Sequence, residues 1–383
     1  MRVVLLGANG MFGKRLAALL AGTPGLQVVL AGRNIAALAK LADALTCIAT
    51  TSIEAYRIDL DAPDHQVQLL NAAPDILIDT CGPFQSRDYH LPKLAIAHRF
   101  HYIDLADAPD YVAGIAQLDS TARSADVLIA SGASSVPALS SAVIDVFAHE
   151  FAELKEIDIG ISPGNRAERG LATVRSILSS VGKPHAQYAQ GKTWRPPAWS
   201  GLRRFNYAAP VGWRWLAYCA APDPLLLPQR YPGLERLQFR AGLELKRMHF
   251  GLWLGGWLVR LRLLRSLLPF ADIAKRISER WINAGSATGA MHVQLRGTNA
   301  HGAAHQVLWQ LIAEQGDGPF VPAAAAATLV RLLAQGRIQQ RGAGPCIGLV
   351  SLDEIQKTLS GRAIRFVHTS GGFLHTSNTS NTP

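Results

Sequence analysis

A glycine-rich turn near the N-terminus constrains this chain more than any other feature. Residues 2–6 read Arg-Val-Val-Leu-Leu, an apolar run typical of a buried strand, and a segment with helical spacing follows the turn. Gly7 permits a tight turn, Gly10 lets the backbone approach a pyrophosphate, and Gly13 lets helix and strand pack closely. The N–H groups at the helix start would then face the phosphates. This strand–turn–helix unit predicts a dinucleotide site. Its residues are Gly7, Ala8, Asn9, Gly10, Met11, Phe12 and Gly13.

The end of the second predicted strand indicates which dinucleotide binds. Residues 26–31 are followed by Gly32, Arg33 and Asn34, with no Asp or Glu to accept from a ribose 2′-hydroxyl, as NAD-binding folds usually have. Arg33 instead offers a planar cation with five N–H donors, which suits a 2′-phosphate. We therefore predict NADP(H), with Arg33 and Asn34 in the cofactor site. The alternative is that Arg33 is a solvated loop residue.

Strands and helices alternate through residues 1–135. This order predicts the α/β class, with an N-terminal doubly wound parallel sheet whose strand ends share the edge where ligands bind. The expected strands are 2–6, 26–31, 55–58, 76–80, 101–105 and 127–131, and the expected helices are 11–21, 35–45, 65–72, 89–98 and 112–125.

Several polar or turn-forming residues lie near the C-terminal ends of these strands or just after them and are candidates for the site. Asp59 is placed to reach adenine, and Ser131 to line the nicotinamide pocket. In the turn Cys81-Gly82-Pro83, glycine permits a close approach of the backbone and proline fixes the chain direction. Tyr102 and Asp104 are the candidate catalytic groups, with ordinary sheet or loop roles as the alternative.

The pattern changes after residue 135, and residues 136–341 predict a second α+β domain. Residues 291–295 and 306–312 are expected to form an antiparallel pair, and the alanine-rich segment 322–335 a helix that Gly336 ends. Arg166, Arg169 and Arg175 lie near a predicted helix and are candidate substrate residues, since arginine pairs with carboxylates in a bidentate manner.

Composition narrows the classes of protein. The chain has 383 residues, 49% of them hydrophobic, and a formal net charge of +10. Its basic residues form no nucleic-acid-reading pattern, so we expect no nucleic-acid partner. The four cysteines show no C-x-x-C pair and the histidines no ligand spacing, so we expect a reduced, cytoplasmic protein without a metal. No signal peptide is expected before the first strand.

Residues 248–268 are the most hydrophobic stretch. The uninterrupted apolar run is about ten residues long, whereas a spanning helix needs about 20. Trp253 and Trp257 lie four apart, and three arginines follow. Three interpretations are open: a helix covering an apolar substrate pocket, a helix peripheral to an anionic membrane, or a helix buried in the second domain.

The segments L-I-D-T-C-G-P-F-Q-S at 77–86 and H-Y-I-D-L-A-D at 101–107 carry a family resemblance. With G-L-A-T-V-R-S-I-L, G-P-F-V-P-A-A-A-A and R-G-A-G-P-C-I-G-L further on, the chain resembles the saccharopine dehydrogenase-like NADP-binding oxidoreductase family. The resemblance implies hydride transfer to or from a C=N, C=O or C=C bond. It also implies that residues 342–366 return to the first domain, before a tail at 367–383 that its Ser/Thr/Asn content predicts to be disordered.

The sequence does not identify the substrate. No set of side chains reads plainly as a site for the carboxylates of saccharopine, and the tryptophans with the apolar stretch suggest a larger, lipid-like ligand. The alternative functions are a non-catalytic NADP-binding sensor and a membrane-associated accessory protein. A homodimer is a further expectation.

Overall fold

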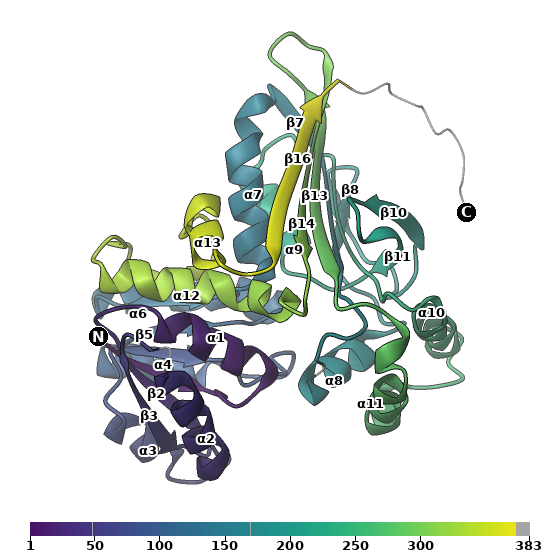
Figure 1. Cartoon of the computed structure of the whole chain (residues 1–383). Helices are drawn as coiled ribbons and strands as arrows, with labels where there is room; N and C mark the ends of the chain where they lie inside the picture. Colours follow the sequence, from purple (N-terminus) through teal and green to yellow (C-terminus); the bar gives the residue numbers. More distant parts are fainter. Residues whose placement is uncertain (48, 169, 373–383) are drawn as a thin grey trace.

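The computed structural model describes residues 1–47, 49–168 and 170–372, which form two sheets with their helices (Figure 1). The first sheet is parallel throughout, with strand order β15-β6-β5-β4-β1-β2-β3. The order reverses at β1, between β2 and β4, which is where doubly wound sheets bind ligands. The strands are β1 (Arg2–Leu6), β2 (Gln27–Gly32), β3 (Ser52–Arg57), β4 (Ile76–Asp79), β5 (His101–Asp104), β6 (Leu128–Ser131) and β15 (Gly342–Pro345).

Strand β1 shows why this sheet lies between helices on both sides. Val3 and Leu5 belong to one apolar core and Val4 and Leu6 to the other, so every residue after Arg2 is buried. Continuous apolar strands of this kind are typical of parallel sheets covered on both faces. The helices of this part are α1 (Met11–Ala21), α2 (Ile35–Thr46), α3 (His65–Asn71), α4 (His90–His98), α5 (Pro109–Gly114) and α6 (Asp119–Ser124).

The helix expected over 112–125 is broken into three pieces. Helix α5 begins earlier, with Pro109 at its first position, and ends at Gly114, a residue that weakens helices. A 3₁₀ turn, Ile115–Leu118, then leads to α6.

The second sheet is mixed and has nine strands. Its main path is β10-β11-β12-β7-β13-β14-β16, with β8 beside β12 and β9 beside β8. The predicted antiparallel pair is confirmed as β13 and β14. The strands are β7 (Glu153–Ser162), β8 (Gln187–Ala189), β9 (Lys192–Trp194), β10 (Arg203–Tyr207), β11 (Gly212–Tyr218), β12 (Arg236–Ala241), β13 (Gly289–Thr298), β14 (Ala304–Ala313) and β16 (Ile364–Gly371).

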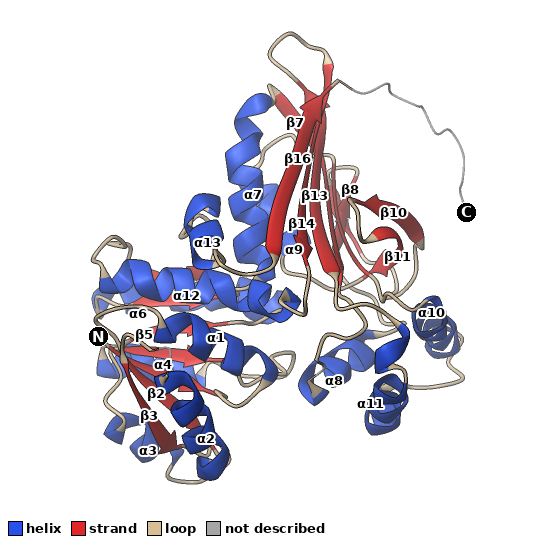
Figure 2. Ribbon diagram, viewed as in Figure 1, coloured by secondary structure: helices blue, strands red, loops and turns tan. Residues whose placement is uncertain are grey.

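The remaining helices fall into two groups (Figure 2). One group lies between the sheets or against the face of the second sheet, and consists of α7 (Ser140–Phe147), α9 (Asp223–Arg230), α12 (Val321–Ala334) and α13 (Leu352–Thr358). The other gathers at one end of the second sheet and consists of α8 (Leu171–Ser180), α10 (Lys246–Arg260) and α11 (Ala271–Arg280). Short 3₁₀ or π turns are Ser135–Leu139, Ala148–Glu150, Leu268–Phe270, Ile282–Ala284 and Gly318–Phe320.

The C-terminal return is real but differs in extent from the prediction. Strand β15 pairs with β6 in the first sheet, and α12, which the sequence placed in the second domain, lies against α1 of the first. Strand β16 then rejoins the second sheet beside β14, so residues 364–366 do not stay with the first domain.

The predicted disordered tail is wrong for residues 367–371, which complete β16. Their composition is polar, but main-chain pairing with β14 does not depend on side-chain polarity, and Phe366 stacks on Trp309 just before them. Residues 373–383 of that predicted tail lie outside the described residues.

Candidate functional site

The glycine turn between β1 and α1 is closed by backbone contacts. Gly7 has φ +74°, and its N–H donates to the carbonyl of Ala31 at 2.9 Å, while Gly10 N–H donates to the Gly7 carbonyl at 2.8 Å. A Cβ on Gly13 would lie 2.2 Å from the Gly7 oxygen. Helix α1 has no side-chain cap, so the amides of its first turn remain free to face an anion.

A cleft of about 510 Å³ opens at this edge of the first sheet. It contains nine of the predicted cofactor residues: Gly7, Asn9, Gly10, Met11, Phe12, Arg33, Cys81, Gly82 and Pro83. Its lining also includes residues that the sequence did not single out: Leu6, Gly32, Ile58, Leu60, Asp61, Thr80, Arg87, Gly170, Leu171 and Thr173. The last three approach from the second domain, which sequence order alone does not reveal.

Five predicted cofactor residues do not line the cleft. Ala8 and Gly13 are buried beneath the turn. Asn34 caps α2, its side chain accepting from Ala37 N–H at 3.0 Å. Asp59 accepts from the N–H of Asp61 at 3.3 Å and so shapes the loop after β3. Ser131 is fully buried and donates to Asp104 at 2.9 Å.

Arg33 stands at the end of β2 with its guanidinium in solvent. Its side chain is 73% exposed and makes one ion pair, at 3.2 Å, with Asp61, which is 84% exposed. An exposed pair of this kind contributes little to stability and opens readily. Arg33 is therefore available to a ligand in the cleft, and Asp61 competes for it.

A buried ion pair lies behind the turn at residues 81–83. Asp79, at the end of β4, is 1% exposed; it accepts from Arg87 at 2.6 Å and from Cys81 N–H at 2.8 Å. Burial raises the pKa of Asp79, and the charge of Arg87 opposes that rise. Arg87 also donates to the Cys81 carbonyl at 3.0 Å, so the pair fixes the turn that lines the cleft.

Tyr102 and Asp104, the candidate catalytic groups, are fully buried and line neither the cleft nor the pocket described below. Tyr102 lies 3.4 Å from the hydroxyl of Tyr111, and burial raises its pKa well above the ordinary value. Asp104 accepts from Ser131, from Gly132 N–H at 2.8 Å and from Ala106 N–H at 3.0 Å. Burial raises the pKa of Asp104 to about 7. The arrangement gives Asp104 a positioning role, holding the turn after β6.

An apolar pocket of about 300 Å³ adjoins the cleft and shares Met11, Phe12 and Thr173 with it. Its other walls are mainly apolar and come from the second sheet, from α8 and α12, and from the turns and loops beside them: Ser135, Ile161, Pro163, Gly164, Asn165, Ala167, Glu168, Val174, Ile177, Leu243, Glu244, Ala287, Gly289, Ala290, Met291, Leu311, Ala313, Gly318, Pro319, Val321 and Pro322. Among its described walls there is no Lys or Arg. Glu244 already accepts from Ser286 and Arg214.

Two of the candidate substrate arginines, Arg166 and Arg175, are not among the residues that line this pocket. Arg166 is exposed and donates to the Asn283 carbonyl at 3.5 Å, and Arg175 faces Asp272 of α11 at 3.7 Å. Arg169 lies outside the described residues. Helix α10 contributes nothing to the described walls of the pocket, so these walls do not support the interpretation that residues 250–259 cover an apolar substrate.

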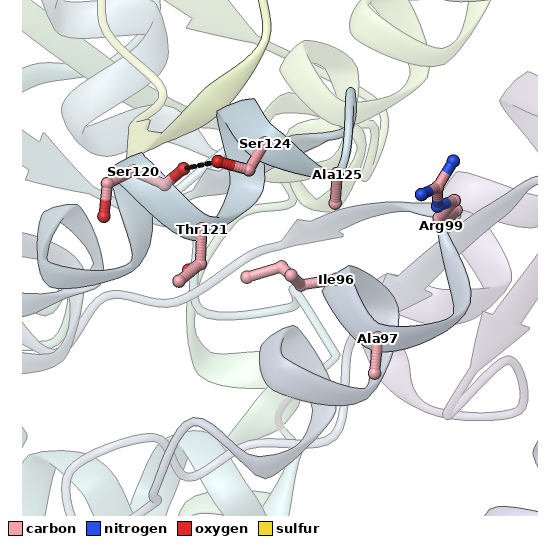
Figure 3. Close-up of a pocket in the computed structure, with 7 residues that line it drawn as sticks. All are labelled: Ile96, Ala97, Arg99, Ser120, Thr121, Ser124 and Ala125. Carbon is pink, nitrogen blue, oxygen red and sulfur yellow. Dashed lines mark hydrogen bonds between the residues drawn. The ribbon is translucent and has the colours of Figure 1, made fainter.

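A hollow on another surface of the first domain lacks the features of a reactive site. It lies between α4 and α6, where Figure 3 shows Ile96, Ala97, Arg99, Ser120, Thr121, Ser124 and Ala125 around it. Ser124 donates to the backbone carbonyl of Ser120 at 3.0 Å, so this hydroxyl serves α6 itself. We find no cluster of His, Cys, Asp or Glu able to hold a metal ion in the described chain.

Comparison with known proteins places the first domain in a family. Residues 3–130 match the family described as saccharopine dehydrogenase NADP binding domain. The first domain therefore matches this family of NADP-binding domains, which confirms the resemblance seen in the sequence. No curated protein sequence matches the chain.

Solved structures extend the likeness to the whole fold. Apo saccharopine dehydrogenase (L-Glu forming) from Saccharomyces cerevisiae superposes with a TM-score of 0.66 at 13% identity, over 97% of this chain and 100% of that one. A meso-dapdh mutant with DAP from Clostridium tetani E88 gives a TM-score of 0.46 at 12% identity, over 92% and 95%. The first match shows a shared two-domain fold, and the second is too distant to argue from.

Proposed function

We propose that the protein is an NADP(H)-dependent oxidoreductase that acts on a predominantly apolar substrate, by hydride transfer to or from a C=N, C=O or C=C bond. The observation that carries this proposal is the junction of the two cavities. The cleft behind the glycine turn and the apolar pocket share three lining residues, so a cofactor in the first would border a substrate in the second. When bound, the nicotinamide would supply or take up the hydride.

The residues of the cleft fit a dinucleotide. The turn at 7–13 has no side chain where a pyrophosphate would approach Gly10, and the first amides of α1 are free. Arg33 stands where a 2′-phosphate would lie, beside Ile58 and Leu60, which offer an apolar surface to an adenine ring. The chain thus provides phosphate donors, a cation and an apolar base site in the order that NADP requires.

The composition of the pocket argues for the class of substrate. Its described walls have no Lys or Arg, and the cations nearest to its two carboxylates are already paired with them, Arg15 with Glu168 and Arg214 with Glu244. The chain's role there is to orient the substrate against the cleft and to exclude water. A dicarboxylic amino acid is therefore a poorer fit than an apolar carbonyl, imine or enoyl compound.

The choice of cofactor is tested at Arg33 and its partner. Arg33→Ala should weaken NADPH binding about 10-fold, as expected for the loss of one exposed charged hydrogen bond, and leave NADH binding unchanged. Asp61→Asn should strengthen NADPH binding a few-fold, because it removes the carboxylate that competes for Arg33. Calorimetric titration of both cofactors measures this, and equal affinity of the wild type for NADPH and NADH would contradict the assignment.

A variant with a narrower apolar pocket tests whether the protein turns over an apolar substrate. Ala167 lies in a turn on the pocket wall and is half-buried, so Ala167→Phe should fill part of the space without disturbing the cleft. We expect oxidation of NADPH with members of a panel of apolar ketones, imines and enoyl thioesters. For those members Ala167→Phe should lower kcat/KM about 10-fold or more while NADPH affinity is unchanged. NADPH binding without turnover on any member would favour the non-catalytic sensor instead.

A further inference from the structure

Exposed apolar side chains are concentrated on α10, α11 and the connection between them. Fourteen large apolar side chains are exposed in the described chain, and eight of them fall between residues 254 and 277. They reach 67% exposure at Leu263 and 56% at Ile273. Single exposed apolar residues are ordinary, but a cluster of this size marks an interaction surface. We call this set the apolar face: Leu254, Trp257, Leu261, Leu263, Leu268, Phe270, Ile273 and Ile277.

The spacing of these residues follows the helices. On α10 and just beyond it, exposed residues fall at 254, 257 and 261, and along α11 they fall at 270, 273 and 277. Intervals of three and four place each set on one side of its helix. Other sides of both helices are already used: Leu252 of α10 and Ala271 and Ala274 of α11 pack in one cluster with α8. The apolar face is therefore a surface that is not packed against the protein's own core.

The same segment carries most of the net charge of the protein. Between residues 246 and 281 there are eight Lys or Arg and two Asp or Glu, a net of +6 out of a formal +10 for the chain. Both acids are engaged, Asp272 with Arg175 and Glu279 with Lys275. Exposed arginines without an ion pair to any carboxylate of the described chain lie among the apolar side chains, at Arg260, Arg262, Arg265, Arg276 and Arg280.

The positive charge around the apolar face indicates which kind of partner would bind it. A second copy of the chain meeting it through a two-fold axis would bring two strongly positive surfaces together. A membrane-spanning helix does not account for this face, because the described part of the chain has no helix long and apolar enough to cross a bilayer. An anionic lipid surface offers apolar depth for the leucines and isoleucines, and phosphates for arginines whose stems lie along it.

We propose that the apolar face of α10 and α11 docks the protein on the surface of a bilayer that contains anionic lipids. This surface is distinct from the cleft and the apolar pocket, and none of its eight residues lines either of them. It is centred further along the chain than the segment 248–268 that the sequence indicated, since α11 supplies Ile273 and Ile277 and Phe270 is its N-cap residue. The proposal does not depend on the enzyme having a particular substrate.

Flotation of the full chain with vesicles tests the proposal. We expect binding to phosphatidylcholine vesicles in which a third of the lipid is phosphatidylglycerol, and little binding to phosphatidylcholine alone. Arg276→Gln with Arg280→Gln should weaken binding to the anionic vesicles about 30-fold. Ile273→Ser with Ile277→Ser should weaken it about 10-fold or more, since both side chains would leave the lipid.

A matched control removes exposed apolar side chains elsewhere. Val67 on α3 and Val146 on α7 are 58% and 41% exposed, so Val67→Ser with Val146→Ser should float like the wild type. Thermal unfolding should change little in all three double variants, because every substituted residue is exposed. Absence of binding to the anionic vesicles would overturn the proposal. So would a wild-type dimer, seen by light scattering, that Ile273→Ser with Ile277→Ser turns into a monomer, since the face would then bind a second copy.

Discussion

Replacing Gly13 by alanine is expected to lower NADPH affinity about 100-fold or more, although alanine is the better helix former by about 1 kcal/mol. The added Cβ would lie 2.2 Å from the carbonyl oxygen of Gly7 and 2.8 Å from the Cα of Ala8. Both are backbone atoms, so the turn must open to relieve the clash. The opened turn would no longer present its amides to a pyrophosphate. The free energy of unfolding should fall by roughly 2 kcal/mol, as for other overpacked sites.

A second glycine in a helix gives the control. Gly251 lies in α10, and a Cβ there would meet nothing within 4 Å. Gly251→Ala should therefore keep wild-type NADPH affinity and gain slightly in stability. Fluorescence titration with NADPH, together with thermal unfolding, separates the two variants. Undiminished binding by a folded Gly13→Ala protein would show that the cofactor does not use this turn.

The parallel sheet could be predicted because its signals are local. A buried parallel strand is apolar along its whole length, and the glycine turn lies between such a strand and a helix, so β1 and α1 have the bounds that the sequence predicted. Strand β16 carries no such signal, because a polar segment at a sheet edge is held by main-chain pairing with β14. Composition therefore predicted a disordered tail where a strand forms.

The candidate site, like the fold, has residues that the sequence reveals and residues that it does not. Arg33 could be found because its place follows from the end of one strand. Arg87 could not, because its importance comes from Asp79, which its side chain reaches across the turn at 81–83. Tyr102 and Asp104 lie on β5, which ends at Asp104, yet β5 is a central strand, and the turn after β6 covers Asp104. Sequence position identifies the edge of the sheet but not which of its side chains remain accessible.

The ion pair between Arg87 and Asp79, behind the turn at 81–83, gives the second large expected effect. Arg87→Met should lower the free energy of unfolding by about 3 kcal/mol at neutral pH, because it leaves the carboxylate of Asp79 buried without its cation. Burial already raises the pKa of Asp79, and losing Arg87 would raise it further. The folded variant would therefore take up a proton as the pH falls, and its deficit relative to the wild type should shrink toward acid pH. Chemical denaturation at several pH values measures both quantities.

Adding Asp79→Asn to Arg87→Met should recover most of this loss. The asparagine oxygen can still accept from Cys81 N–H, which the carboxylate does at 2.8 Å, and no buried charge remains. Removing both partners of a buried pair generally costs far less than removing one. The double variant should also lose the pH dependence of the single one, since the titrating group is gone. A double variant as unstable as Arg87→Met would mean that the contact of the guanidinium with the ring of Phe84, rather than its pairing with Asp79, stabilises the turn.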